Sequence, residues 1–324
     1  MIPTELSISS IETIYRKIKP YISKTPLKKA PKEIDQEFDT SIYFKFECFQ
    51  NSGSFKARGA INNIISSTKK DLQGGITAVS AGNHAIATSY AAKIFNLKNK
   101  IFLYESANPY RISACKNYNA NISFTNANIA FEEVKNAENK GYKFVHPFDG
   151  PETLQGSATL GLEIIHQLKD LNVKIDNILI SVGGGGLISG VGSILKQHIP
   201  SVKIIGIEPI GAKGLTDSLN DNSPLNKVKI NSIADSLSAP LHMPYSFSIA
   251  KQVIDRMINV SDKEMINSMI YAFNNLRLFL EPACVAGFAA LKNYVKKEFK
   301  GQNTLILLCG SNIDYHSWNK LIYS

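Results

Sequence analysis

Short runs of β-branched and aromatic residues alternate with longer amphipathic stretches, and this alternation limits the possible folds more than any other feature of the chain. The runs predicted as strands span residues 41–47, 76–80, 100–105, 121–125, 142–146, 177–182, 203–208 and 303–308. Helical patterns cover residues 84–95, 154–169, 187–198, 261–279 and 285–298. This pattern is typical of βαβ units, so we predict an α/β protein with open parallel sheets and helices on both faces.

The predicted elements also suggest two lobes. Residues 75–146 hold a compact series of strands and helices, after which Pro147, Gly150 and Pro151 interrupt the chain. We therefore predict a small lobe, residues 75–150, inserted into a large lobe formed by residues 1–74 and 151–324. Ligands of open α/β sheets bind beyond the carboxyl ends of the strands, so chemistry is expected in the loops that follow strands.

Composition excludes several classes of protein. The 324 residues are 44% hydrophobic and 19% charged, which is globular, and no apolar run reaches the roughly 18 residues of a membrane span. The net charge of +9 comes mainly from lysines spread along the chain, which predicts a solvated surface and no nucleic-acid partner. The N-terminal residues lack the pattern of a secretory signal, and the four cysteines are scattered, so we expect reduced thiols and a cytoplasmic location.

The first segment with chemical potential is Ser52–Ala60, SGSFKARGA, which follows a predicted strand and contains Lys56. A lysine at a helix N-terminus is electrostatically unfavourable as a surface charge, because the helix dipole attracts anions there. A neutral amine used covalently, as in a Schiff base, resolves this conflict. The alternative is an ordinary solvated lysine.

Two further turns between a strand and a helix can bind anions. Ser80–Ala85, SAGNHA, offers backbone N–H groups and the Asn83 amide, although it also fits a plain helix cap. The run Gly183–Gly186 lets backbone approach a ligand closely and fits a phosphate at a helix N-terminus. The same glycines, with Glu208 closing the next strand, nearly match a dinucleotide fingerprint, but Ser189 replaces its third glycine. A fourth segment, Cys309–Asn312, follows the last predicted strand, where Ser311 could offer a hydroxyl to a heterocycle.

In this order and spacing, the four segments resemble the fold-type II pyridoxal-phosphate enzymes, specifically the serine/threonine dehydratase and serine racemase family. HPFDGPETLQGSATLGLEI, GIEP, SIADSL and EPACVAGFAAL extend the likeness along nearly the whole chain. The resemblance implies a lyase that converts L-threonine, L-serine or 3-hydroxyaspartate to a 2-oxo acid and ammonia. It also implies a homodimer and closure of the small lobe over the substrate.

The resemblance further implies roles for single residues. Lys56 would bind the cofactor covalently and then act as the catalytic base. The other cofactor-binding residues would be Phe55, Asn83, Gly183, Gly184, Gly185, Gly186, Leu187 and Ser311. The substrate carboxylate would meet Ser80, Ala81, Gly82, Asn83 and His84.

Departures from the family pattern limit these expectations. Ala81 stands where the family's racemases carry a proton-transferring serine, which predicts elimination with little racemisation. Glu208 and the Ala212 carbonyl could bind magnesium or calcium, but Gly214 replaces the expected carboxylate ligand. The loop 234–245 diverges after its start, and there His242 and Tyr245 are either substrate contacts or packing residues.

Other functions remain open at this point. A pyridoxal-phosphate lyase or β-replacement enzyme with another leaving group is the nearest alternative, followed by a serine racemase. A dinucleotide-dependent oxidoreductase and a non-catalytic amino-acid-binding protein belong to other classes.

Overall fold

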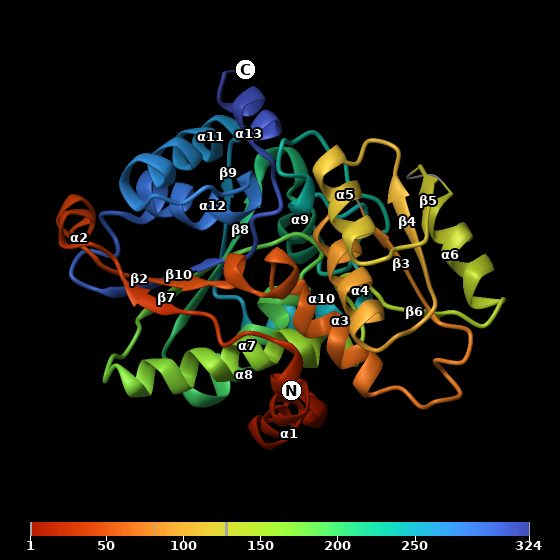
Figure 1. The fold of residues 1–324 in the computed structure, drawn as a ribbon. Helices are drawn as coiled ribbons and strands as arrows, with labels where there is room; N and C mark the ends of the chain where they lie inside the picture. The colour runs from red at the N-terminus through yellow and green to blue at the C-terminus, as the bar shows by residue number, and fades with distance from the viewer. Residues whose placement is uncertain (1, 81, 127–128, 324) are drawn as a thin grey trace.

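A computed structural model describes residues 2–80, 82–126 and 129–323, which fold around two β-sheets (Figure 1). The larger sheet has the strand order β1-β2-β10-β7-β8-β9 and is parallel except for β1, which runs antiparallel to β2. Its strands are β1 Leu27–Lys29, β2 Ser41–Phe46, β7 Asn177–Ser181, β8 Lys203–Pro209, β9 Arg256–Val260 and β10 Asn303–Leu308. The smaller sheet has the order β5-β4-β3-β6 and is parallel throughout. Its strands are β3 Ile76–Ser80, β4 Asn99–Tyr104, β5 Ile122–Thr125 and β6 Lys143–Phe144.

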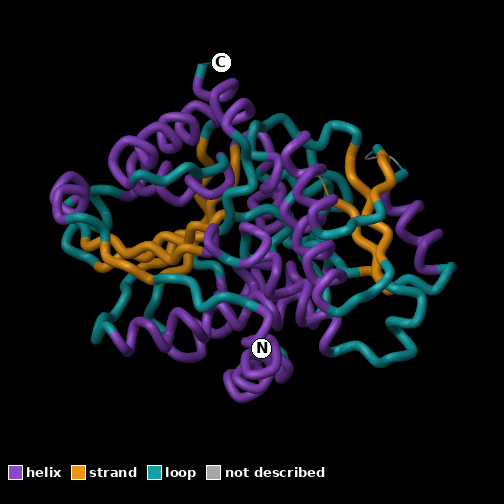
Figure 2. The backbone as a smooth tube through the Cα atoms, viewed as in Figure 1, coloured by secondary structure: helices purple, strands orange, loops and turns teal. Residues whose placement is uncertain are grey.

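Helices cover both faces of the sheets, as the tube view in Figure 2 also shows. They are α1 Ile8–Ile18, α2 Lys32–Phe38, α3 Lys56–Ile65, α4 Asn83–Ile94, α5 Pro109–Asn117, α6 Ala130–Glu138, α7 Pro151–Asp170, α8 Gly186–His198, α9 Gly214–Asn220, α10 Pro244–Val253, α11 Asp262–Tyr271, α12 Pro282–Ala290 and α13 Tyr315–Ile322. None of the helices in the described parts of the chain is long and apolar enough to cross a membrane.

The predicted fold class is confirmed, with the parallel sheets and two-sided helical cover that the alternation indicated. All eight predicted strands are present, although β6 is reduced to two residues. The strands β1 and β9 were not predicted, because three residues at a sheet edge and a mixed polar segment give little periodic signal.

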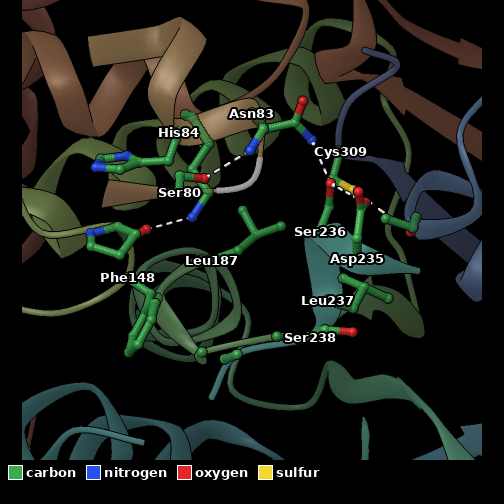
Figure 3. A pocket seen from close by; sticks show the side chains of 18 of the residues that line it. Ser80, Asn83, His84, Phe148, Leu187, Asp235, Ser236, Leu237, Ser238 and Cys309 are labelled. Atoms are coloured by element: carbon green, nitrogen blue, oxygen red, sulfur yellow. Dashed lines mark hydrogen bonds between the residues drawn. The ribbon is translucent and has the colours of Figure 1, made fainter. Parts of the chain in front are cut away.

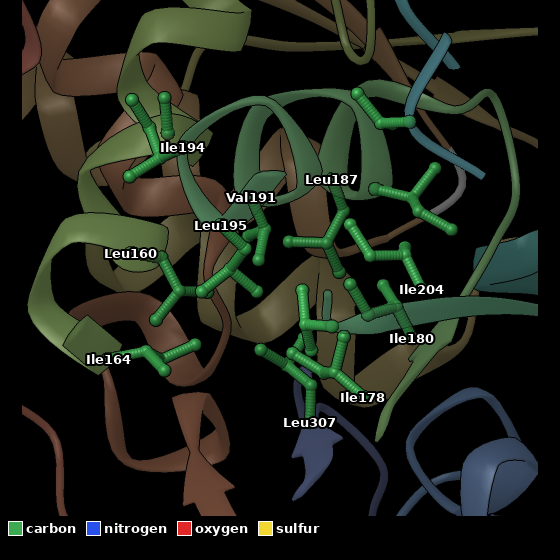
Figure 4. Packing of buried hydrophobic residues seen from close by; sticks show 14 of the residues in the cluster. Leu160, Ile164, Ile178, Ile180, Leu187, Val191, Ile194, Leu195, Ile204 and Leu307 are labelled. Atoms are coloured by element: carbon green, nitrogen blue, oxygen red, sulfur yellow. The ribbon is translucent and has the colours of Figure 1, made fainter. Parts of the chain in front are cut away.

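The core of the larger sheet explains why its strands lack a polar alternation. Every residue of β7 is buried, as expected for a central parallel strand covered on both faces. On one face α7 and α8 pack through Leu160, Ile164, Val191 and Leu195 against the strands (Figure 4). On the other face α11 and α12 bury a second apolar cluster.

The helix α3 lies where the two sheets meet, and two glycines set its position. A Cβ at Gly156 of α7 would lie 2.4 Å from the Gly59 Cα, so only glycine lets these backbones touch. On its other side, Ile61 of α3 packs in one cluster with Ile14 of α1 and with Ile76 and Val145 near the small sheet. The first residue of α3, Lys56, is thereby fixed at the junction of the sheets.

Candidate active site

A pocket of about 990 Å³, its open mouth included, lies between the two sheets. The described lining comes from residues 55–56, 79–80, 82–84, 147–148, 181–188 and 235–240, with the single residues Tyr104, Arg111, Phe131, Ala283 and Cys309. Figure 3 shows side chains of both lobes facing this space. Three of the four predicted segments therefore meet in the structure, together with Cys309 of the fourth.

Lys56 is the amine of the pocket. Its Nζ donates a hydrogen bond to the Pro147 carbonyl, and the Phe55 ring centroid lies 5.0 Å away. Among the described residues, no carboxylate forms an ion pair with it. Burial lowers the pKa of Lys56 to about 8, well below its ordinary value of 10.5, so the neutral amine is far more accessible near neutral pH than in an exposed lysine. A neutral buried amine is a nucleophile, which fits the predicted covalent role.

The glycine run forms a cradle at the N-terminus of α8. Gly185 has φ +89°, and a Cβ at Gly184 would lie 2.1 Å from the Phe148 ring. A Cβ at Gly186 would lie 2.5 Å from the Phe148 carbonyl oxygen. No side chain caps this helix end, so its first N–H groups face the pocket side of the turn, where an anion such as phosphate is favoured. The backbone around Gly183–Leu187 thus fits the phosphate of pyridoxal phosphate.

The turn between β3 and α4 forms the opposite wall. The Gly82 N–H donates to the Ser80 hydroxyl at 3.1 Å, while Ala81 lies outside the described residues. The Asn83 amide donates to Glu281 Oε1 at 2.7 Å and to the Ser236 hydroxyl at 3.2 Å, and it accepts from Asn312 at 2.6 Å. The turn is therefore held to the large lobe by a fixed asparagine.

His84 differs from the prediction. Its Nε2–H donates to the Val145 carbonyl at 2.7 Å, and burial beside Lys56 lowers the pKa of His84 to about 3. The ring is consequently neutral and supplies no positive charge to a carboxylate. It fixes the segment that carries Pro147, the acceptor of the Lys56 hydrogen bond.

Ser311 also differs from its predicted place. Its hydroxyl donates to the Phe279 carbonyl at 2.6 Å, and it does not line the pocket. Cys309 does line the pocket, and its carbonyl accepts from the Phe55 N–H at 3.0 Å, directly before Lys56. The signal was present in the sequence, because Cys309 is the first residue after β10 and strand ends point at ligands.

An ionic cluster built on the buried Arg111 lines the pocket where the lobes meet, and sequence reasoning did not find it. Arg111 of α5 binds both oxygens of Asp235, with Nη2 3.1 Å from Oδ1, and its Nη2 lies 3.0 Å from Glu281 Oε2. Its Nε donates to the Asn312 carbonyl at 2.9 Å. Burial raises the pKa of Glu281, and Arg111 offsets this only in part because Asp235 adds negative charge. We call Arg111, Asp235 and Glu281 the pocket cluster.

The predicted metal ligands do not form a cation site. Both oxygens of Glu208 are taken by the N–H groups of Leu215 and Thr216, each at 2.8 Å, and by the Thr216 hydroxyl at 2.7 Å. In the described chain, no group of three or more histidine, cysteine or acidic residues could hold an ion. Glu208 and Ala212 therefore do not fit magnesium or calcium, because donors occupy the carboxylate that the cation needs.

The two residues singled out in the loop 234–245 lie outside the pocket. The Tyr245 hydroxyl donates to Glu5 at 2.9 Å. His242 is buried against Gly214, and burial lowers its pKa to about 4. Both are packing residues, and the loop meets the pocket through residues 235–240 instead.

Comparison with known proteins gives consistent matches. Residues 18–310 match the family described as "Pyridoxal-phosphate dependent enzyme". The chain is 37% identical to a phenylserine dehydratase of Ralstonia pickettii, over 95% of this chain and 93% of that protein. It is 32% identical to a biosynthetic L-threonine dehydratase of Staphylococcus saprophyticus, over 99% of this chain and 77% of the relative. The structure of maize serine racemase superposes with a TM-score of 0.89 at 29% identity, covering 98% of this chain and 97% of that one.

Proposed function

The chain belongs to the family of pyridoxal-phosphate dependent enzymes, and we propose that it is a dehydratase that converts a β-hydroxy amino acid to a 2-oxo acid and ammonia. The observation that carries this proposal is the position of Lys56. It supplies a buried amine without an acidic partner among the described residues, in one pocket with four consecutive glycines. Because binding of the cofactor phosphate already accounts for these glycines, they give no separate support to a dinucleotide-dependent oxidoreductase.

The residues of the pocket fit the cofactor. Lys56 Nζ would hold its aldehyde carbon, the N–H groups of Gly183–Leu187 its phosphate, and Phe55 and Cys309 would lie at its ring. When bound, pyridoxal phosphate supplies an electron sink that stabilises negative charge at the α-carbon of an amino acid. The Cys309 thiol is a weak hydrogen-bond donor, so it would not force a proton onto the ring nitrogen.

The protein's own groups complete the chemistry. The α4 N-terminus, with the Gly82 turn and Asn83, would receive the substrate carboxylate on backbone N–H groups. Lys56 Nζ, whose lowered pKa makes the neutral amine accessible near neutral pH, would take the α-proton and then give it to the departing β-hydroxyl, which leaves as water. Phe148, Leu187 and Leu237 surround the reacting region and would exclude water from it (Figure 3).

Elimination is favoured over racemisation by one position of the sequence. Racemisation needs a second proton carrier on the opposite face of the α-carbon, and residue 81 is alanine, which has no exchangeable side-chain proton. We therefore propose that a serine racemase activity is minor. Conversion of L-serine to D-serine at a rate similar to ammonia release would contradict this.

We further propose a cytoplasmic homodimer with two lobes, residues 75–150 closing over the large lobe. The four cysteines, all free and buried, suit a reducing compartment. The dimer rests on the family resemblance, and light scattering of the purified holoenzyme tests it.

The direct test of the function measures 2-oxo acid and ammonia with a panel of β-hydroxy and other β-substituted amino acids. We expect both products from β-hydroxy substrates, and no product from the Lys56→Ala variant, whose protein should also lack the visible absorption of the bound cofactor. The conservative variant Lys56→Arg retains the charge but cannot form the imine, so it serves as the matched control. Preference for a leaving group other than hydroxyl would instead identify a lyase of the alternative type.

A further inference from the structure

The charge and shape of the pocket point to a narrower substrate class. We propose that the enzyme selects β-hydroxy amino acids whose β-substituent is neutral and apolar, up to the size of an aromatic ring, and rejects those with a second carboxylate. This inference rests on the dehydratase function proposed above. It concerns the side-chain subsite, the part of the pocket that holds the side chain of the substrate. The roles proposed above for the reacting groups do not change.

A second carboxylate on the substrate would find no free positive charge. The basic side chains in the described lining are Lys56 and Arg111, because His84 is neutral. Lys56 is committed to the cofactor. Arg111 carries one positive charge but already binds two carboxyl groups, those of Asp235 and Glu281. Its charge is therefore fully compensated within the protein.

The pocket instead presents a negative charge to the substrate. The Arg111 side chain is 5% exposed and Glu281 is 1% exposed, whereas the Asp235 side chain is 51% exposed and lines the pocket. A substrate carboxylate near Asp235 would meet a like charge, and in addition would lose its own hydration. Rejection of one ligand by a repulsive group is an effective route to specificity.

Much of the remaining wall of the subsite is apolar and comes from both lobes. In the small sheet Ser80 pairs with Leu103, so Tyr104 lies one residue beyond it, at the sheet edge that carries the carboxylate-binding turn. Phe131, in the first turn of α6, lines the same pocket and is only partly buried by its neighbours. From the large lobe, Leu237 and Pro240 complete the wall (Figure 3 for Leu237).

An apolar substituent of the substrate would make favourable contacts with these two aromatic rings and two aliphatic side chains. A charged substituent would find no compensating charge among them. A ring in the substrate buries far more surface than a methyl group, and aromatic side chains pack favourably against it. The apolar wall and the compensated arginine therefore favour the same class of side chain.

The test compares 3-phenylserine, L-threonine and 3-hydroxyaspartate as substrates of the holoenzyme. We expect kcat/KM for 3-hydroxyaspartate to be at least about tenfold below that for the two neutral substrates, and phenylserine to be used at least as well as threonine. Turnover of 3-hydroxyaspartate equal to that of phenylserine overturns the proposal, as does a clear preference for threonine over phenylserine.

Binding without reaction separates this inference from the proposed function. L-Phenylalanine and L-aspartate lack the β-hydroxyl leaving group and share the same α-amino and carboxylate groups, so the difference between their affinities, measured by calorimetry with the holoenzyme, reports on the side-chain subsite. We expect phenylalanine to bind at least about tenfold more tightly than aspartate. If no β-hydroxy amino acid releases ammonia, the dehydratase function fails, but the order of these two affinities still decides the inference.

A pair of variants isolates the charge. Asp235→Asn keeps the shape and leaves Arg111 with only Glu281, so it should raise the ratio of 3-hydroxyaspartate to phenylserine kcat/KM by about tenfold. Ser236→Ala removes a neutral partner of Arg111 and Asn83 from the same loop and should leave that ratio within about twofold. Equal ratios in the two variants would show that the charge of Asp235 does not select the substrate.

Discussion

Two buried arginines of this chain sit in clusters of opposite character. Arg58, with Lys45, Glu47 and Glu163, forms a sealed cluster of two cations and two anions, all at most 1% exposed. The pocket cluster has one cation and two anions, and its Asp235 is half exposed. The sealed cluster is balanced and closed to solvent, whereas the pocket cluster is unbalanced and open.

The geometry of the sealed cluster explains its role. Arg58 binds both oxygens of Glu47 at 2.8 Å and Glu163 at 3.1 Å. Lys45 donates to Glu163 at 2.6 Å, and to Thr25 and Gln167 at 2.7 Å. Because Arg58 follows Lys56 by two residues in α3, this cluster fixes the helix that carries the catalytic amine. We infer that the sealed cluster, whose charges balance, fixes the position of α3. The pocket cluster carries an excess negative charge, which can act on a ligand.

The largest expected effect comes from breaking the sealed cluster. Arg58→Ala removes the ion pair of Glu47 and leaves Glu163 paired with Lys45 alone, and uncompensated buried charge typically costs about 3–5 kcal/mol. We expect a loss of that order in the free energy of unfolding, measured with denaturant. A loss under about 1 kcal/mol would mean that water reaches the cluster.

Breaking the pocket cluster should affect catalysis more than stability. Arg111→Gln releases the link between α5 and the loop at Asp235, and it leaves Glu281 bound only by Asn83. We expect kcat/KM to fall by about ten- to a hundredfold, chiefly through KM, because Asn83 and the carboxylate-binding turn lose their support. The loss of unfolding free energy should stay below that of Arg58→Ala, since Asp235 can turn to solvent.

The pH dependence of the free energy of unfolding should distinguish Glu163 from Glu281. Burial alone would raise the pKa of Glu163, but Arg58 and Lys45 bring it below the ordinary value of 4.5, whereas the pKa of Glu281 is raised above it. The contribution of Glu163 to stability is therefore present above about pH 4.5 and lost as the pH falls below it. The contribution of Glu281 runs the other way and is lost as the pH rises above about 4.5.

Free energies of unfolding measured from below pH 4.5 to neutral pH test the contributions of both carboxylates. Glu163→Gln should flatten the acid-side loss of stability, and Glu281→Gln should flatten the decline toward neutral pH. The same slope in both variants would contradict the difference between the clusters.

The smallest effect is expected at the surface. Arg256 and Glu298 form an ion pair of 2.7 Å with side chains 45% and 56% exposed. Arg256→Ala should change the free energy of unfolding by about 0–1 kcal/mol, because exposed pairs gain little over hydrated charges. This variant is the control for Arg58→Ala, since it also removes an arginine from an ion pair. A loss comparable to that of Arg58→Ala would show that burial does not set the scale.

The sequence predicted what depends on local pattern. The strands, the glycine cradle and Lys56 at the start of α3 follow from periodicity and turn chemistry within short segments. Arg111, Asp235 and Glu281 could not be found in that way, because their contacts join residues 124 and 170 positions apart. The prediction for Ser311 was wrong because local pattern does not decide which residue after β10 enters the pocket, and the one that does lies two positions earlier.

The central claim is that, of Lys45 and Lys56, Lys56 alone binds the cofactor. Lys45 has each of its three N–H donors satisfied within the sealed cluster, while Lys56 donates to one carbonyl and faces the pocket. Borohydride reduction of the holoenzyme followed by peptide mass mapping should find the phosphopyridoxyl group on Lys56 and leave Lys45 unmodified. A label on Lys45, or none on Lys56 in protein saturated with pyridoxal phosphate, would contradict the account.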